Sequence, residues 1–175
     1  IRELYKCGIR DFGENYVQEL LKKKTELSDL PDIRWHLIGH LQSNKAKIVA
    51  DQIEYFHALD SVNLAMQLDK CLSQKQIPQP LKVFVELNVD GEASKTGLDR
   101  AEACTLIEAV LKLKYLNLVG IMIIPAPREN NNELRQVFSD TRIFAEGLSK
   151  KFGIKLELSM GMSSDFGLAI QEGAN

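Results

Sequence analysis

Short apolar runs alternate with longer amphipathic segments along the whole chain, and this alternation restricts the fold more than any other feature. The run from Leu118 to Ile124 is apolar throughout, as expected for a strand that helices cover on both faces. Repeated strand–helix order predicts parallel strands joined by right-handed crossovers. We predict strands at Arg10–Gly13, Arg34–Gly39, Tyr55–Leu59, Lys82–Val89, Asn117–Ile124 and Lys155–Met160.

The segments between these runs have helical periodicity. Apolar residues recur at i, i+3 and i+4 spacing from Leu134 to Phe152 after an Asn-rich start, and a second apolar stripe follows Asp99. Helices are also predicted at Tyr16–Leu27, Ser43–Ala50, Ser61–Lys75 and Ser164–Glu172.

Two architectures fit this order, a doubly wound sheet and a (β/α)8 barrel. No GxGxxG turn follows any strand, which disfavours the dinucleotide-binding form of the first. The chain starts with what looks like the end of a helix at Ile1–Gly8, and its six strands fall short of the eight that close a barrel of about 250 residues. We therefore expect one α/β domain over residues 1–175, a parallel TIM-type barrel that lacks its first and last strands. Such a chain would expose two strand edges, and we expect it to be aggregation-prone alone.

Composition excludes several classes of protein. With a net charge of −2 and no basic stripe, the sequence does not suggest nucleic-acid binding. No apolar run reaches the roughly 18–20 residues of a membrane span, and no signal peptide is apparent. Cys7, Cys71 and Cys104 form no CxxC pair, so we expect reduced thiols, no metal site and a cytoplasmic location.

Polar residues follow several predicted strands, where parallel α/β folds place functional groups. Asn15 is either a helix N-cap or an amide in the barrel mouth. His36 shares a strand face with Ile38 and is either a satisfied core residue or a pocket residue. Ser43 is predicted to cap a helix whose first turn holds Lys45, which opposes the helix dipole unless an anion is near.

Two further segments have polar residues that suggest a site. The stretch from Ser159 to Asp165 places a glycine and serines before a helix, which suits a phosphate but equally suits simple helix capping. The polar loop from Asp90 to Gly97 is either a solvated turn or a means of placing the Lys95 amine near the barrel mouth.

These segments together resemble the pyridoxal-phosphate homeostasis family, also called the proline synthase co-transcribed homologues. The resemblance implies a barrel like that of alanine racemase, with pyridoxal 5'-phosphate (PLP) held at its mouth. It also implies a carrier or regulator of vitamin B6 supply without established catalysis, monomeric at full length. The matching motifs occur in family order at Phe12–Glu19, Trp35–Lys45, Ser94–Gly97, Ile123–Pro127 and Leu158–Asp165.

The resemblance also assigns residues. Ser163 matches a phosphate-binding serine, Asn15 matches an asparagine beside the Schiff-base lysine, and His36 and Met162 match positions that line the cofactor pocket. The Schiff-base lysine itself is expected upstream of Ile1 and is absent from these residues. The rest of the phosphate cradle, an Arg-Ile-Gly-Thr-type turn, is expected after the last residue.

Two rival functions remain open. A PLP-dependent amino-acid racemase needs an acid/base group on each side of the substrate carbon, usually including a tyrosine from a second domain. Nothing in the sequence indicates that role for Tyr5, Tyr16, Tyr55 or Tyr115. The other rival is a phosphate-binding barrel enzyme that shares only the scaffold.

Overall fold

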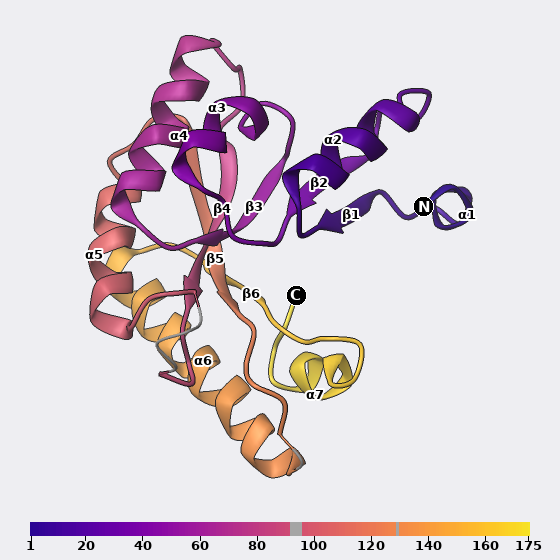
Figure 1. Ribbon diagram of the computed structural model, residues 1–175. Helices are drawn as coiled ribbons and strands as arrows, with labels where there is room; N and C mark the ends of the chain where they lie inside the picture. The colour runs from indigo at the N-terminus through magenta and orange to yellow at the C-terminus, as the bar shows by residue number, and fades with distance from the viewer. Residues whose placement is uncertain (92–95, 129) are drawn as a thin grey trace.

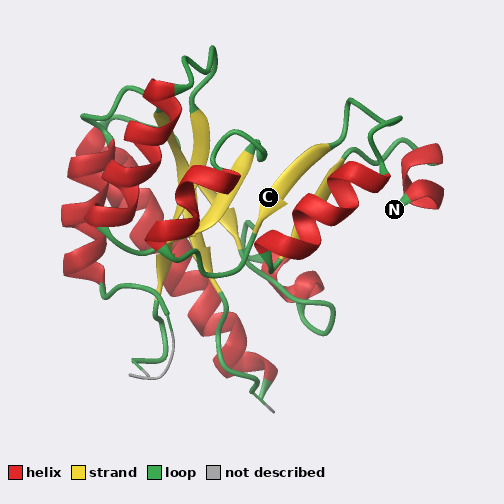
Figure 2. Ribbon diagram, turned by 45° about the horizontal axis from the view of Figure 1, so that its top comes forward, coloured by secondary structure: helices red, strands yellow, loops and turns green. Residues whose placement is uncertain are grey.

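The computed structural model describes residues 1–91, 96–128 and 130–175, which build one sheet of six parallel strands with helices along its outer face (Figures 1 and 2). The spatial order of the strands follows the sequence, β1-β2-β3-β4-β5-β6. This arrangement confirms the predicted partial parallel barrel. The strands are β1 (Asp11–Glu14), β2 (Arg34–Leu37), β3 (Tyr55–Leu59), β4 (Leu81–Leu87), β5 (Leu116–Ile123) and β6 (Glu157–Ser159).

The helices lie close to the positions that the periodicity predicts. The largest difference is at Ser43–Ala50, where a short 3-10 turn and a short α-helix replace one predicted helix. The helices are α1 (Arg2–Lys6), α2 (Val17–Glu26), η1 (Ser43–Lys45), α3 (Ala46–Val49), α4 (Val62–Gln74), α5 (Arg100–Val110), α6 (Asn131–Phe152) and α7 (Phe166–Gln171).

Local capping explains where the longer helices begin. Asp99 forms a full capping box with Glu102 at the start of α5. Asn130 accepts a hydrogen bond from the backbone N–H of Asn132 at the start of α6, and Ser61 accepts one from Leu64 at the start of α4. Each cap satisfies backbone donors that a helix start leaves unpaired.

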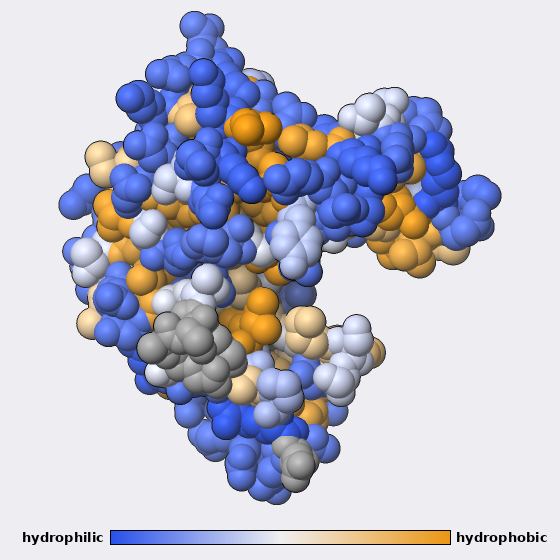
Figure 3. Space-filling view, viewed as in Figure 1, coloured by the Kyte–Doolittle hydropathy of each residue, from blue (hydrophilic) through white to orange (hydrophobic). Residues whose placement is uncertain are grey.

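The central strands β4 and β5 hold the core together. All but one residue of β4 is buried, which fits a strand covered on both faces. On the outer face the apolar stripes of α4 and α5 pack against these strands. In the space-filling view the molecule is hollowed between the part that carries β1 and α2 and the part that carries α7 (Figure 3). The inner face of the sheet lines this hollow.

Among the described residues, β1 and β6 each pair with a single strand. The expectation that the chain associates through exposed strand edges therefore stays a prediction. No helix in the described part of the chain is both long and apolar enough to cross a membrane. Of the three free thiols, Cys71 is buried, Cys104 is half-buried and Cys7 is exposed.

Strands β5 and β6 approach each other closely at Gly120. A Cβ atom at this position would lie 2.1 Å from the carbonyl oxygen of Glu157 and 2.7 Å from Cε1 of Phe84. Since real Cβ atoms essentially never come so close to backbone atoms, a glycine is needed where the sheet curls toward β6.

We expect Gly120→Ala to destabilise the protein by about 1–3 kcal/mol, because the added methyl forces the β5–β6 pair apart. Gly147→Ala is the matched control. Residue 147 is exposed in α6 with open space around its Cα, so this substitution should stabilise the protein by about 0.5–1 kcal/mol. Urea unfolding of both variants measures the difference, and an equal effect of the two would contradict the β5–β6 register.

Candidate functional site

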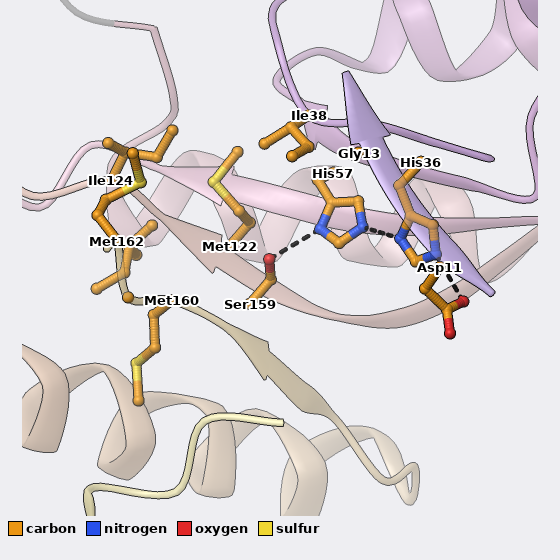
Figure 4. Close-up of a pocket in the computed structure, with 12 residues that line it drawn as sticks. Asp11, Gly13, His36, Ile38, His57, Met122, Ile124, Ser159, Met160 and Met162 are labelled. Carbon is orange, nitrogen blue, oxygen red and sulfur yellow. Dashed lines mark hydrogen bonds and ion pairs between the residues drawn. The ribbon is translucent and has the colours of Figure 1, made fainter. Parts of the chain in front are cut away.

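A cavity of about 230 Å³ lies inside the curl of the sheet and reaches the carboxyl ends of the strands (Figure 4). One end is polar and carries side chains of β1, β2, β3 and β6, and the other is apolar. The lining residues are Asp11, Gly13, His36, Ile38, His57, Met122, Ile123, Ile124, Ser159, Met160, Gly161 and Met162.

A continuous row of hydrogen bonds crosses the polar end (Figure 4). Asp11 Oδ1 lies 3.1 Å from His36 Nε2, and His36 Nδ1 lies 2.9 Å from His57 Nε2. His57 Nδ1 in turn lies 2.8 Å from Ser159 Oγ. The row joins β1 to β6 through two imidazole rings, although His57 and Ser159 are far apart in the sequence.

Ring stacking fixes the planes of both imidazoles. His36 stacks on Tyr55 with ring centres 4.2 Å apart and planes inclined by 9°. His57 stacks on Phe84 at 4.4 Å and 15°. Each ring is therefore held in the orientation that its two hydrogen bonds require.

Burial makes both histidines poor bases. It lowers the pKa of His57 to about 4, with a further contribution from the neighbouring His36. Burial also lowers the pKa of His36, although the hydrogen bond to Asp11 works in the opposite direction. Burial alone would raise the pKa of Asp11, but hydrogen bonds from Arg34 and His36 outweigh it and the net shift is downward. At neutral pH the row consists of a carboxylate, two neutral imidazoles and a hydroxyl.

A second, larger cavity of about 640 Å³ adjoins the apolar end, and Ile124 and Met162 line both cavities. Its most buried polar group is the Glu86 carboxyl, 6% exposed, whose Oε1 accepts a hydrogen bond of 2.7 Å from Thr96. Burial raises the pKa of Glu86, and this effect outweighs the hydrogen bond from Thr96, which acts in the opposite direction. This cavity therefore combines apolar walls with a carboxyl that resists ionisation.

The structure brings two of the four predicted site residues together and leaves two apart. His36 and Met162 line the same cavity. Asn15 instead lines a separate hollow of about 460 Å³ with His40 and Lys45. Ser163 is exposed on the β6–α7 connection, next to Met162.

Several interpretations of the loop residues need correction. Asn15 does not cap α2, because Tyr16 is the N-cap residue and no side chain caps that helix. Ser43 is the first residue of η1 rather than a cap, and Lys45 lies at the start of α3. Lys95 lies outside the described residues, so its proposed place near the mouth stays a prediction.

The structure also differs from the prediction at the last helix, whose start was expected to bind an anion. The helix begins at Phe166 rather than Ser164 and has six residues, so its dipole is small. The backbone N–H of Met162 donates to Oδ1 of Asp165 at 2.6 Å. One of the amides expected to meet a phosphate is thus already engaged, and the exposed hydroxyls of Ser163 and Ser164 are further possible donors on this turn.

Sequence reasoning did not identify His57 and Glu86 as site residues, and it named Ser159 only as the first residue of the Ser159–Asp165 stretch. A weak signal existed, because His57 alternates with Tyr55 and therefore shares its strand face, toward the same side as His36 in the neighbouring strand. Nothing in the sequence links β3 to β6. Their contact depends on the curl of the sheet.

Comparison with known proteins agrees with this geometry. The family described as "Alanine racemase, N-terminal domain" matches residues 1–174. The pyridoxal phosphate homeostasis protein of Aquifex aeolicus is 42% identical over 175 residues, which cover 99% of this chain and 75% of that protein. Its Escherichia coli counterpart is 36% identical over 176 residues, with 99% and 74% covered.

The chain belongs to the pyridoxal phosphate homeostasis protein family. Solved structures of PipY from Synechococcus elongatus, without and with PLP bound, superpose with TM-scores of 0.92 and 0.91. Both are 38% identical to this chain and cover 99% of it, and the match spans 81% of PipY. An alanine racemase of Clostridium difficile, 15% identical with a TM-score of 0.69, shares the fold.

The low pKa of His57 predicts a specific dependence of stability on pH. Between pH 6.5 and about 4 the unfolded chain takes up a proton that the folded protein excludes, so the free energy of unfolding falls on acidification. His57→Phe keeps an aromatic ring against Phe84 and removes the imidazole that causes this pH dependence. We expect urea unfolding to show that the free energy of unfolding falls further in wild type than in the variant over this pH range. The difference should be at most roughly 3 kcal/mol.

Glu86→Gln is a companion variant for which we expect the opposite effect, a gain in stability at neutral pH. The raised pKa of Glu86 makes the unfolded chain lose this proton first as the pH rises above 4.5, so the wild-type carboxyl costs stability there. The glutamine should relieve that cost.

Parallel pH profiles for wild type and His57→Phe would show that His57 is not buried as the structure places it.

Proposed function

We propose that this chain binds PLP at the open end of its partial barrel and serves to hold the cofactor rather than to catalyse a reaction. One observation carries the proposal: Met162 and His36 line one cavity that reaches the carboxyl ends of the strands, and PipY, 38% identical, has been solved with PLP bound. The expected single domain, monomeric state and cytoplasmic location stay predictions.

The residues present fit the two parts of this cofactor. Ile124 and Met162 offer an apolar wall for an aromatic ring, with the His57–Ser159 pair at the polar end. Ser163 offers an exposed hydroxyl for the phosphate. Gly161 has φ +101°, and a Cβ there would lie 2.8 Å from Cβ of Ala169, so only glycine allows this tight turn beside the wall.

When bound, PLP supplies an aldehyde that reacts reversibly with amines. The protein's own groups bind the phosphate, shield the ring from water and hold protons in place along the Asp11–Ser159 row. Asp165 next to the phosphate position is unfavourable for an anion, and the hydrogen bond from the Met162 N–H reduces that effect. Binding should therefore depend on the Ser163 hydroxyl.

We expect Ser163→Ala to weaken PLP binding by about tenfold, since the lost hydrogen bond is to a charged group. Ser73→Ala, at an exposed position of α4, is the matched control and should leave the affinity unchanged. Calorimetric titration with PLP and with unphosphorylated pyridoxal measures both effects. Equal affinity for the two ligands, or no loss in Ser163→Ala, would rule out Ser163 as the phosphate contact.

A racemase is the main alternative, and the tyrosine positions do not favour it. Tyr5 contacts Asp32 away from the mouth, Tyr55 is stacked on His36, and Tyr115 is half-buried. Tyr16 is exposed in the hollow beside Asn15, not in the His36 cavity. We expect no D-alanine when the protein is incubated with L-alanine and PLP, and sustained turnover would replace the carrier proposal with an enzymatic one.

A further inference from the structure

The cavity of about 640 Å³ that adjoins the His36 cavity has a buried carboxyl in its wall with one oxygen unused. Glu86 is 6% exposed, and its Oε2 atom is buried without a hydrogen-bond partner. Its other oxygen, Oε1, accepts a hydrogen bond of 2.7 Å from Thr96. A buried acceptor without a partner costs stability, and such atoms are rare in folded proteins. The proposed function gives Glu86 no part, so its free oxygen points to another ligand.

The lining of this cavity is apolar and acidic. It has a second carboxyl, Asp165, whose Oδ1 accepts the N–H of Met162. Among the described residues of the lining there is no lysine, arginine or histidine. The apolar walls are formed by Leu87, Val89, Ile124, Pro125, Pro127 and Met162. A buried carboxyl among apolar walls suits a cation that carries an apolar stem.

The protein itself leaves the Glu86 charge largely uncompensated. Burial raises the pKa of this carboxyl, and the hydrogen bond from Thr96 offsets only part of that effect. Asp60 and His40 act on it from the segments that follow β3 and β2, with smaller effects of opposite sign. A bound cation would supply the counter-charge that the described residues do not.

The one free oxygen determines which cation fits. A guanidinium pairs best with both oxygens of a carboxylate, and Oε1 is already engaged by Thr96. An ammonium is a compact charge that needs only one acceptor here. The terminal torsion of a glutamate is soft, so a small rotation turns Oε2 toward the cavity. We propose that this cavity binds a primary alkylammonium ion, with Glu86 as the anion that accepts its hydrogen bond and the apolar walls in contact with its stem.

The amine site adjoins the cavity in which we place the cofactor, because Ile124 and Met162 line both. Primary amines are the compounds with which the PLP aldehyde reacts. This link between the two cavities rests on the proposed function. Binding of the amine itself needs no cofactor.

The test titrates the cofactor-free protein with n-pentylamine and follows the methyl resonances of its four methionines. Met162 lines the cavity, whereas Met66, exposed on α4, is a reference outside it. We expect the Met162 signal to shift and the Met66 signal to stay. Glu86→Gln should weaken the affinity for pentylamine about tenfold, because a charge-assisted hydrogen bond is lost. Pentanol, which has the same stem and no charge, should bind wild type more weakly and bind both proteins equally.

Two controls separate Glu86 from a general effect of charge. Glu19→Gln removes one negative charge at an exposed position of α2, outside the cavity, and should keep the wild-type affinity. The affinity of wild type should also fall as the pH is lowered, since a proton on Glu86 competes with the ammonium. Asp165, Asp60 and His40 stay in place in Glu86→Gln, so a weaker pH dependence in that variant identifies Glu86 as the titrating group.

Equal affinity of wild type and Glu86→Gln for pentylamine would overturn the inference, and so would pentanol binding to wild type as tightly as pentylamine. A Met162 signal that does not respond to pentylamine would also overturn it. If Glu86→Gln does not fold, the two compounds and the pH profile of wild type decide the question. None of these results involves PLP, so the calorimetric titration with PLP tests the proposed function separately.

Discussion

The curl of the parallel sheet is the constraint on which the rest of the structure depends. A flat sheet in the order β1 to β6 would hold its two edge strands far apart. The curl lets His57 on β3 contact Ser159 on β6 and lets a single hydrogen-bonded row extend from Asp11 across the interior. Gly120 permits this curl, since a side chain at that position would clash with the backbone of β6. Both cavities lie along this inner face.

The candidate site has a polar end and an apolar end, which suit different parts of a ligand. The deep end is polar, with each donor matched to an acceptor and with both imidazoles held neutral by burial. The outer end is apolar, and Met162 and Ile124 form a shared wall between the two cavities. A flat ring with a charged tail suits such a site, because the ring can lie on the wall while the tail stays in water beside Ser163.

Much of the fold could be predicted from the sequence because it depends on local patterns. Apolar runs located all six strands, and Asp99 and Asn130 marked the starts of α5 and α6. The failures were also local. At Asn15 and Ser43 the side chains that suggested caps are not used as caps, since a cap depends on backbone geometry that composition does not determine.

The candidate site could be anticipated from the sequence only in those segments that resemble family motifs. His36 and Met162 line one cavity, Asn15 faces a different hollow and Ser163 lies exposed on the surface, and the assignment of these four residues to cofactor binding stays a prediction. The role of His57 could not be predicted, because its partner Ser159 is 102 residues away and the two meet only through the curl of the sheet. A structure of this chain with PLP tests the account most directly. We expect the ring in the cavity between His36 and Met162 and the phosphate beside Ser163, whereas PLP in the Asn15–Lys45 hollow, or no ordered PLP at saturating concentration, would contradict it.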